Sequence, residues 1–134
     1  MANKKLNVLA VDDDKDLLFL INIWLKENFN VQTAIDGNDC LKKLDKKINL
    51  ILLDIMMPGP KPNELIRIIK EKSPQAYVIY LTNLDVFNIT PEQEKKEWKP
   101  ILKPPIIGYI NKPVDKTGLL KKIEEVFKIK KFLK

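Results

Sequence analysis

The chain has 134 residues, 45% of them apolar, and a formal net charge of +6. This length suits one ordinary domain, so we expect residues 1–134 to form a single domain with its own core. One cysteine and no histidine exclude a Cys/His zinc site, an intramolecular disulfide and catalysis by a histidine base. No apolar run approaches the roughly 18 residues of a membrane-spanning helix. The first residues also lack an apolar leader segment, so we expect a cytoplasmic protein without membrane insertion.

Basic residues are concentrated towards the C-terminus. Residues 111–134 carry 8 lysines and 3 acids, a sum of 8 − 3 = +5. Every base except Arg67 is a lysine, so the planar guanidinium that favours phosphate and base readout is almost missing. We therefore interpret the lysines as a solvated surface and expect no direct contact with nucleic acid.

Short apolar runs alternate with amphipathic stretches along the chain. The runs predict five strands, at residues 6–11, 31–34, 49–53, 77–81 and 106–110. Apolar residues at helical spacing predict helices at 16–28, from 37 to about 48, at 63–72 with Asn63 as the cap, and at 114–134. Gly108 interrupts the fifth run, and the prolines and glycine within 57–62 predict a loop.

The stretch between the fourth and fifth strands has a less regular pattern. Thr90, Pro91 and Glu92 predict the start of a short helix that reaches about Trp98. Three prolines follow between residues 100 and 105. We therefore expect a short or displaced fourth helix, followed by an irregular loop.

Strands that alternate with helices predict an α/β fold, a doubly wound five-stranded parallel sheet with helices on both faces. The runs at 6–11 and 49–53 are almost wholly apolar, as expected for strands that are covered on both sides. In such sheets the functional crevice lies at the carboxyl ends of the strands. The residues that end the strands are Asp12, Asp13 and Asp14 after the first, Asp54 after the third, Thr82 after the fourth and Lys112 after the fifth.

The predicted crevice gathers carboxylates, a hydroxyl and a lysine. Three or more carboxylates in one crevice repel each other strongly unless a cation lies among them. Because histidine and cysteine are absent there, the ligands are all oxygen atoms, which favours Mg²⁺. A lysine and a hydroxyl suit a phosphoryl group, and a carboxylate beside Mg²⁺ can accept that group as an aspartyl phosphate.

Four stretches resemble the receiver domain of bacterial two-component response regulators. They are Val11-Asp12-Asp13-Asp14, residues 53–58, Leu81-Thr82 and residues 109–113. The likeness covers essentially the whole chain and implies the strand order 2-1-3-4-5. It further implies a signalling protein of a phosphorelay, a monomer or weak homodimer that receives its phosphoryl group from a histidine kinase or a histidine phosphotransfer protein.

The resemblance gives the acidic residues distinct roles. It implies that Asp54 is the phosphoacceptor. It implies that Mg²⁺ is held by Asp13 directly, by Asp12 mainly through water, by Asp54 and by the backbone carbonyl of Met56.

The resemblance also gives roles to the residues that face the acids. Thr82 is expected to bond the phosphoryl oxygens and to move inward on phosphorylation. Lys112 is expected to pair with Asp54 or its phosphoryl group, and the bond between residues 112 and 113 is cis in the family. Tyr109 matches the aromatic residue that rotates inward behind Thr82.

The sequence departs from the family's pattern near the phosphoacceptor and after the threonine. Lys61 and Pro62 stand where the family usually has Asp-Gly, so we expect the loop to follow a different path. Asn83 replaces a usual Ala or Gly. The interval from Thr82 to Lys112 is 112 − 82 = 30 positions, longer than usual, which supports the altered fourth helix.

Two further positions bear on the lifetime of an aspartyl phosphate. In the family, the residues two after the phosphoacceptor and two after the threonine influence its hydrolysis. Here they are Met56 and Leu84, whose side chains offer no polar group to hold a water molecule. We therefore expect slow self-dephosphorylation.

Other functions remain open at this stage. The chain ends about where the fifth helix should end, as in a stand-alone receiver, but the sequence also suits a receiver cut from a longer DNA-binding regulator. A receiver-like module that binds proteins and is never phosphorylated is a third possibility. Taken singly, Asp12–Asp14 could cap a helix, Thr82 could lie in a turn and Tyr109 could only pack. The presence of all five groups, Asp12, Asp13, Asp54, Thr82 and Lys112, favours the phosphoacceptor.

Overall fold

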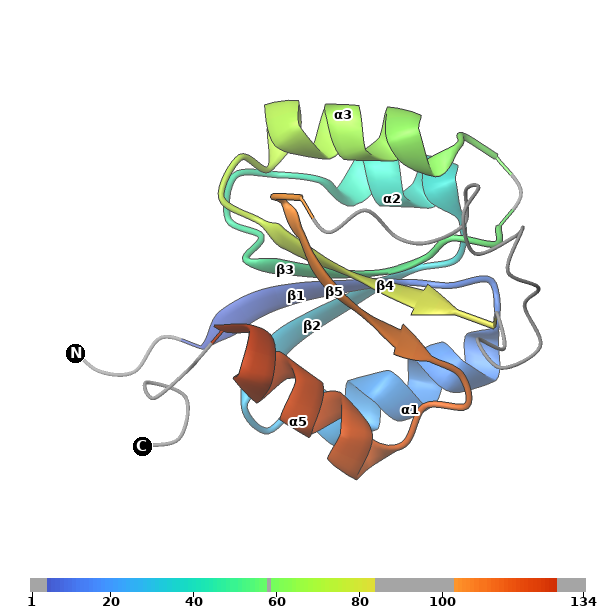
Figure 1. Cartoon of the computed structure of the whole chain (residues 1–134), viewed down its shortest axis with the longest axis vertical. Helices are drawn as coiled ribbons and strands as arrows, with labels where there is room; N and C mark the ends of the chain where they lie inside the picture. Colours follow the sequence, from blue (N-terminus) through green and yellow to red (C-terminus); the bar gives the residue numbers. More distant parts are fainter. Residues whose placement is uncertain (1–4, 58, 84–102, 128–134) are drawn as a thin grey trace.

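A computed structural model describes residues 5–57, 59–83 and 103–127 of the chain. One parallel sheet has the order β2-β1-β3-β4-β5, which confirms the predicted topology (Figure 1). Its strands are β1 (Leu6–Val11), β2 (Phe29–Ala34), β3 (Leu50–Asp54), β4 (Tyr77–Thr82) and β5 (Ile106–Asn111). The helices α1 (Lys15–Leu25) and α5 (Lys116–Phe127) cover one face, and α2 (Gly37–Lys43) and α3 (Pro62–Lys72) cover the other (Figure 1).

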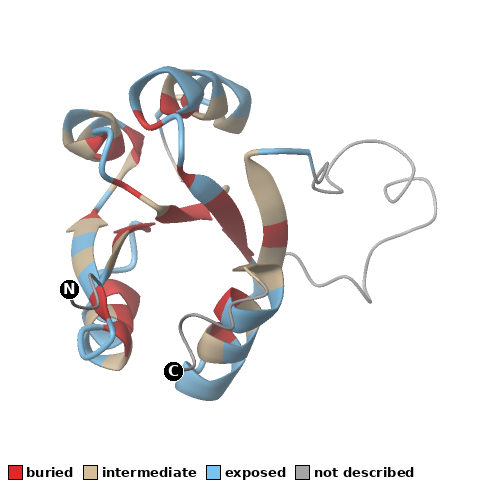
Figure 2. Cartoon of the chain, turned by 90° about the vertical axis from the view of Figure 1, so that its left-hand side faces the viewer, coloured by how far each residue is buried: buried red, intermediate tan, exposed pale blue. Residues whose placement is uncertain are grey.

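The core consists of two apolar layers, one on each face of the sheet. Successive residues of a strand point to opposite faces, so Val8 and Ala10 pack with α1 and α5 whereas Leu9 and Val11 pack with α2 and α3. The central strand β3 is buried at every position. Figure 2 shows the buried residues on the strands and the inner sides of the helices. This double burial explains why β1 and β3 have no alternation of polar residues.

The first two helices are shorter than the sequence pattern predicts. α1 ends at Leu25, and β2 then begins at Phe29, two residues before the predicted strand. α2 ends at Lys43, because Leu44 has an extended backbone with ψ of 134°. Leu44 and Ile48 are nevertheless buried, so their apolar character reflects packing of a loop rather than a longer helix.

The start of α3 differs from the prediction. Asn63 does not cap the helix: Lys61 is the N-cap residue, without a side-chain cap bond, and Pro62 is within the first turn. The fixed φ of proline suits the first helical position, so the helix begins before Asn63. The predicted stop is confirmed, because the helix ends at Lys72 and the N–H of Ser73 donates to Ile69 O.

The fifth strand contains the predicted irregularity at Gly108. The register with β4 shifts between Val78, which faces Ile106, and Ile79, which faces Gly108. A Cβ atom at Gly108 would lie 3.1 Å from Val126 Cγ1, so the glycine lets α5 approach the sheet closely. Residues 128–134 of the predicted last helix, and the predicted short helix within 84–102, lie outside the described residues.

The described helices are short. Within these parts of the chain, none of the helices has the length and apolar character needed to cross a membrane. The longest described helix, α5, has only 12 residues and carries several charges.

Candidate functional site

The strand ends bring the predicted acidic residues to one edge of the sheet. β1 and β3 are paired so that Val11 lies beside Leu53. The residue that follows each of them along the chain is acidic, Asp12 after Val11 and Asp54 after Leu53. Asp12, Asp13 and Asp54 each offer a carboxylate oxygen, and these atoms all lie within 4.8 Å of one another. The structure thus confirms that these three carboxylates form one cluster.

The three consecutive acids after β1 have different environments. Asp12 has no exposed surface, and its Oδ1 accepts the N–H of Asp14 at 2.9 Å. Asp13 is exposed. Asp14 is the N-cap of α1, since its Oδ1 accepts the N–H of Leu17 at 3.1 Å. Asp14, although exposed, therefore provides the cap of α1 and leaves Asp12 and Asp13 available as ligands.

Asp54 lies at the end of the fully buried strand β3 and is only 3% exposed. Its Oδ1 accepts the N–H of Met56 at 2.8 Å, which fixes the orientation of the carboxylate. Its Oδ2 faces the ammonium of Lys112 at 3.4 Å. The side chain of Met56 is exposed. Its backbone carbonyl is the predicted fourth oxygen ligand, a role that stays a prediction.

Lys112 reaches into the carboxylate cluster from the end of β5. Its Nζ lies 2.8 Å from Asp12 Oδ2 and 3.4 Å from Asp54 Oδ2. The family resemblance pointed to the pair with Asp54, and the shorter contact with Asp12 was not predicted. The N–H of Lys112 donates to Thr82 O at 2.7 Å, and the bond from Lys112 to Pro113 is cis, as in the family.

Burial and charge act against each other in this cluster. Loss of water around Asp12 raises the pKa of its carboxyl group. The contacts with Lys112 and with the N–H of Asp14 partly offset this rise, whereas the negative charge of Asp54 adds to it. Burial disfavours the ammonium of Lys112, but contacts with Asp12 and then Asp54 more than compensate, so the pKa of Lys112 is raised. The cluster contains three carboxylates and one ammonium, so its formal charge is negative.

The cluster fits a hard divalent cation. Asp12 Oδ2 is buried and has no hydrogen-bond partner of ordinary geometry, although it forms the ion pair with Lys112. Asp54 lies beside it, and exposed Asp13 lies at the solvent side of the group. A set of carboxylate oxygens open to water on one side is the donor set that Mg²⁺ prefers. An acidic cluster of this kind is typical of a receiver Mg²⁺ site.

Thr82 and Tyr109 lie where the sequence pattern placed them. Thr82 ends β4 and is buried beside the end of β5, where it pairs with Asn111. Tyr109 pairs with Tyr80, is half-buried, and packs in the layer that also contains α2 and α3. Thr82 is therefore at the cluster's edge, whereas the inward rotation of Tyr109 stays a prediction.

The unusual loop after Asp54 packs against the start of α2. Gly59 has a positive φ of 110°, a conformation that favours glycine. A Cβ atom at Gly37 would lie 3.0 Å from Pro60 Cδ and would crowd this contact. Gly37 therefore allows the proline-containing loop to lie close to α2. Asn83, the other departure from the family's pattern, is exposed after the end of β4.

Comparison with known proteins identifies the family. The model of the response regulator receiver domain matches residues 8–124. The chain therefore belongs to the receiver domain family, whose members are phosphorylated by histidine kinases.

Solved receiver structures have the same fold. A CheY-like receiver domain protein from Methanospirillum hungatei is 28% identical, with a TM-score of 0.72, and the match covers 93% of this chain and 96% of that chain. The chemotaxis protein CheY4 of Vibrio cholerae is 25% identical, with a TM-score of 0.73 and coverage of 92% and 99%.

Curated relatives are longer than this chain. The transcriptional regulatory protein CpxR of Escherichia coli is 41% identical over 76 residues, which are 56% of this chain and 32% of CpxR. A relative from Haloferax volcanii is 31% identical over 120 residues, and these residues make up 19% of the length of that relative. The match with this chain thus spans between about a fifth and a third of these relatives.

Proposed function

We propose that this chain is the phosphoacceptor of a two-component phosphorelay. Asp54 receives a phosphoryl group from a phosphohistidine of a histidine kinase or phosphotransfer protein, and phosphorylation then switches the binding of a downstream protein. The observation that carries this proposal is the pairing of two buried carboxylates, Asp12 and Asp54, with one lysine, beside a third carboxylate that is open to solvent.

The proposed transfer uses groups that lie close together at the ends of the strands. A carboxylate oxygen of Asp54 attacks phosphorus, the bond from phosphorus to the donor's imidazole nitrogen breaks, and its electron pair returns to that nitrogen. The ammonium of Lys112, already 3.4 Å from Asp54, neutralises negative charge on the transferring oxygens. The hydroxyl of Thr82 is the proposed donor to one of these oxygens.

The cation site supports the same step. Asp12, Asp13, Asp54 and the backbone carbonyl of Met56 are the groups that would hold Mg²⁺. When bound, the ion offsets the repulsion between the acidic cluster and the incoming phosphoryl group. The role of this chain is to keep Asp12 and Asp54 buried and oriented through the N–H groups of Asp14 and Met56.

Intact mass after incubation with acetyl phosphate and Mg²⁺ tests the proposal. We expect the parent chain and the matched variant Asp16→Asn, which changes an exposed acid outside the cluster, each to gain one phosphoryl group. Asp54→Asn should gain none. A parent chain that binds Mg²⁺ but gains no phosphoryl group from this donor or from a phosphohistidine donor would refute the phosphoacceptor role and favour an unphosphorylated binding module.

The lifetime of the product is a separate part of the proposal. The N–H of Met56 bonds Asp54, and its exposed side chain has no group that could orient a water molecule towards phosphorus. We expect slow self-dephosphorylation, and Met56→Asn should accelerate it. Decay of the phosphorylated mass signal with time after donor removal gives both rates, and equal rates would remove Met56 from the explanation.

A second reading has one specific observation in its favour. CpxR is a transcriptional regulatory protein, and the matched part of this chain covers only 32% of it. This supports a related role as the receiver of a longer DNA-binding regulator. The length of the natural open reading frame distinguishes a stand-alone receiver from this arrangement, and the Asp54 chemistry is the same in both.

A further inference from the structure

Gly37, the first residue of α2, lies in a narrow space between that helix and the start of α3, which covers the same face of the sheet (Figure 1). A Cβ atom at this position would lie 3.0 Å from Pro60 Cδ and 3.6 Å from each Cδ atom of Leu65. Gly37 is buried and does not have the positive φ that favours glycine. The need for glycine here therefore comes from space and not from backbone conformation.

Hydrogen bonds hold α2 on its side of this space. Asp36 Oδ1, at the cap of the helix, accepts the N–H of Asp39 at 2.7 Å, and Asp39 Oδ2 accepts the N–H of Ile35 at 3.1 Å. In the last turn, the ammonium of Lys43 donates to Thr33 O of β2 at 2.6 Å. A shift of α2 would break these bonds, so a methyl group added at its first residue displaces the loop that packs against it.

The loop that contains Pro60 is continuous with the candidate site. It starts after Asp54, whose Oδ1 accepts the N–H of Met56 at 2.8 Å. It ends at Lys61, the N-cap of α3, whose carbonyl accepts the N–H of Leu65 at 3.0 Å. Because α3 fixes the far end, a displacement of the half-buried proline ring is taken up on the side of the loop that leads to the carboxylate cluster.

We infer that Gly37 is a positioning residue for the cation site and acts through Pro60. By leaving room for the proline ring, it lets the loop follow the path that sets the place of the Met56 carbonyl. This positioning role rests on the proposed function, in which that carbonyl joins the three carboxylates as a ligand of Mg²⁺. Because Mg²⁺ demands near-ideal octahedral geometry, a displacement of a few tenths of an ångström at a ligand weakens its binding.

Calorimetric titration with Mg²⁺ tests this role in four chains: the parent, Gly37→Ala, Pro60→Ala and the double variant. We expect Gly37→Ala to weaken Mg²⁺ binding about threefold, less than the roughly tenfold cost of losing a group that touches a metal ligand directly. Pro60→Ala removes the Cδ atom and so makes room for the methyl group. In the Pro60→Ala background, Gly37→Ala should therefore leave the Mg²⁺ affinity unchanged.

Gly118→Ala is the matched control, because it makes the same change in the first turn of α5 on the other face of the sheet. The atom that its Cβ would meet at 3.0 Å is Oδ1 of exposed Asp115, a side-chain atom that can turn away. This variant should bind Mg²⁺ as the parent does. Far-UV circular dichroism and urea unfolding separate a loss of Mg²⁺ affinity from a loss of folded protein.

The same titrations can overturn the positioning role. Equal Mg²⁺ affinities for the parent and Gly37→Ala contradict it and leave the proposed function intact, whereas a parent chain that does not bind Mg²⁺ refutes the cation site itself. A weakened Gly37→Ala that Pro60→Ala does not rescue excludes Pro60 as the route. If Gly37→Ala alone does not fold, a double variant that folds and binds Mg²⁺ supports the contact, and one that does not contradicts it.

Discussion

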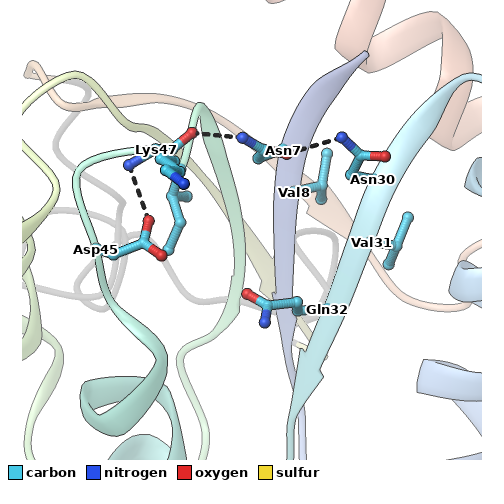
Figure 3. Close-up of a pocket in the computed structure, with 8 residues that line it drawn as sticks. Asn7, Val8, Asn30, Val31, Gln32, Asp45 and Lys47 are labelled. Carbon is cyan, nitrogen blue, oxygen red and sulfur yellow. Dashed lines mark hydrogen bonds between the residues drawn. The ribbon is translucent and has the colours of Figure 1, made fainter. Parts of the chain in front are cut away.

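Polar side chains lie at both edges of the sheet, where the strands end and where they begin, but their partners differ between the two edges. At the carboxyl edge, Asp12 and Asp54 are buried with a single lysine between them. At the amino edge, Asn7 donates through its side chain to Lys47 O at 2.9 Å and accepts from Asn30 at 3.0 Å (Figure 3). The N–H of Asn7 donates to Asn49 Oδ1 at 2.8 Å.

The comparison shows how a functional edge differs from a structural one. Neutral amides at the amino edge find protein partners and tie β1 to β2 and to the segment before β3. Asn7 and Asn30 line a cavity of about 240 Å³ together with Asp45 and Lys47, and the side chain of Asn7 is bonded to Asn30 and to Lys47 O (Figure 3). At the carboxyl edge, one ammonium, that of Lys112, faces the two buried carboxylates of Asp12 and Asp54, and Asp13 adds a third carboxylate to the cluster. An excess of carboxylates over ammonium groups therefore marks the edge where a cation completes the structure.

Loss of the lysine should have the largest effect. Without Mg²⁺, Lys112→Met removes the cation between two buried carboxylates, and we expect unfolding free energy to fall by roughly 2–4 kcal/mol. Mg²⁺ should restore part of this loss, because it supplies positive charge to the same oxygens. Urea unfolding with and without Mg²⁺ measures both effects. Lys47→Met, an exposed lysine at the amino edge, should show neither, and equal losses for the two variants would contradict the comparison.

Asp13 should separate ligand binding from folding. It is exposed, so Asp13→Asn should lower Mg²⁺ affinity about tenfold or more with little change in stability. Calorimetric titration gives the affinity. The neighbouring variant Asp14→Ala should do the reverse, because it removes the cap of α1 at about 1 kcal/mol while leaving the cluster intact. Equal Mg²⁺ affinities for the parent chain and Asp13→Asn would exclude Asp13 as a ligand.

The amino edge should affect stability alone. Asn49→Ala leaves the N–H of Asn7 without its acceptor, and we expect a loss of about 1–2 kcal/mol in unfolding free energy. Mg²⁺ affinity and phosphorylation should stay at the parent level. Asn30→Ala, at an exposed position, should cost less. A change of Mg²⁺ affinity in Asn49→Ala would show that the two edges are coupled.

The smallest expected effect on unfolding free energy concerns Asp39, an acid at the carboxyl edge whose carboxylate has partners within the protein. Asp39 accepts the N–H of Ile35 and lies near Lys43, so the pKa of its carboxyl group is lowered. A carboxyl group whose pKa is lower in the folded state than in the unfolded state stabilises the folded protein at pH values above the unfolded-state pKa. This stabilisation is lost as the pH falls through the folded-state pKa. Asp39→Asn should therefore reduce unfolding free energy at pH 7 by less than about 1 kcal/mol.

The sign of that effect is its test. Melting temperatures of the parent chain and Asp39→Asn should differ at neutral pH and converge towards about pH 3. Asp16→Asn, an exposed acid without these contacts, serves as the control. A difference that grows as the pH falls would contradict the assigned cause.

The sequence by itself determined the sheet and the place of the site. Continuous apolar runs at β1 and β3 required two covered faces, and parallel strands necessarily end at the same edge. The order of the strands and the residues that follow them were therefore enough to predict that Asp12, Asp13, Asp54 and Lys112 lie together. The resemblance to receivers then added roles that spacing alone could not supply.

Only the tertiary structure decided which of these groups are buried and which of them contact one another. Burial differs between Asp12, Asp13 and Asp14 although they are consecutive, because the turn from β1 to α1 directs each side chain to different surroundings. The shorter contact of Lys112 with Asp12 depends on the packing of β5 across the sheet, which local sequence does not encode. The early end of α2 has the same cause, since burial of Leu44 and Ile48 in a loop produces the apolar spacing of a helix.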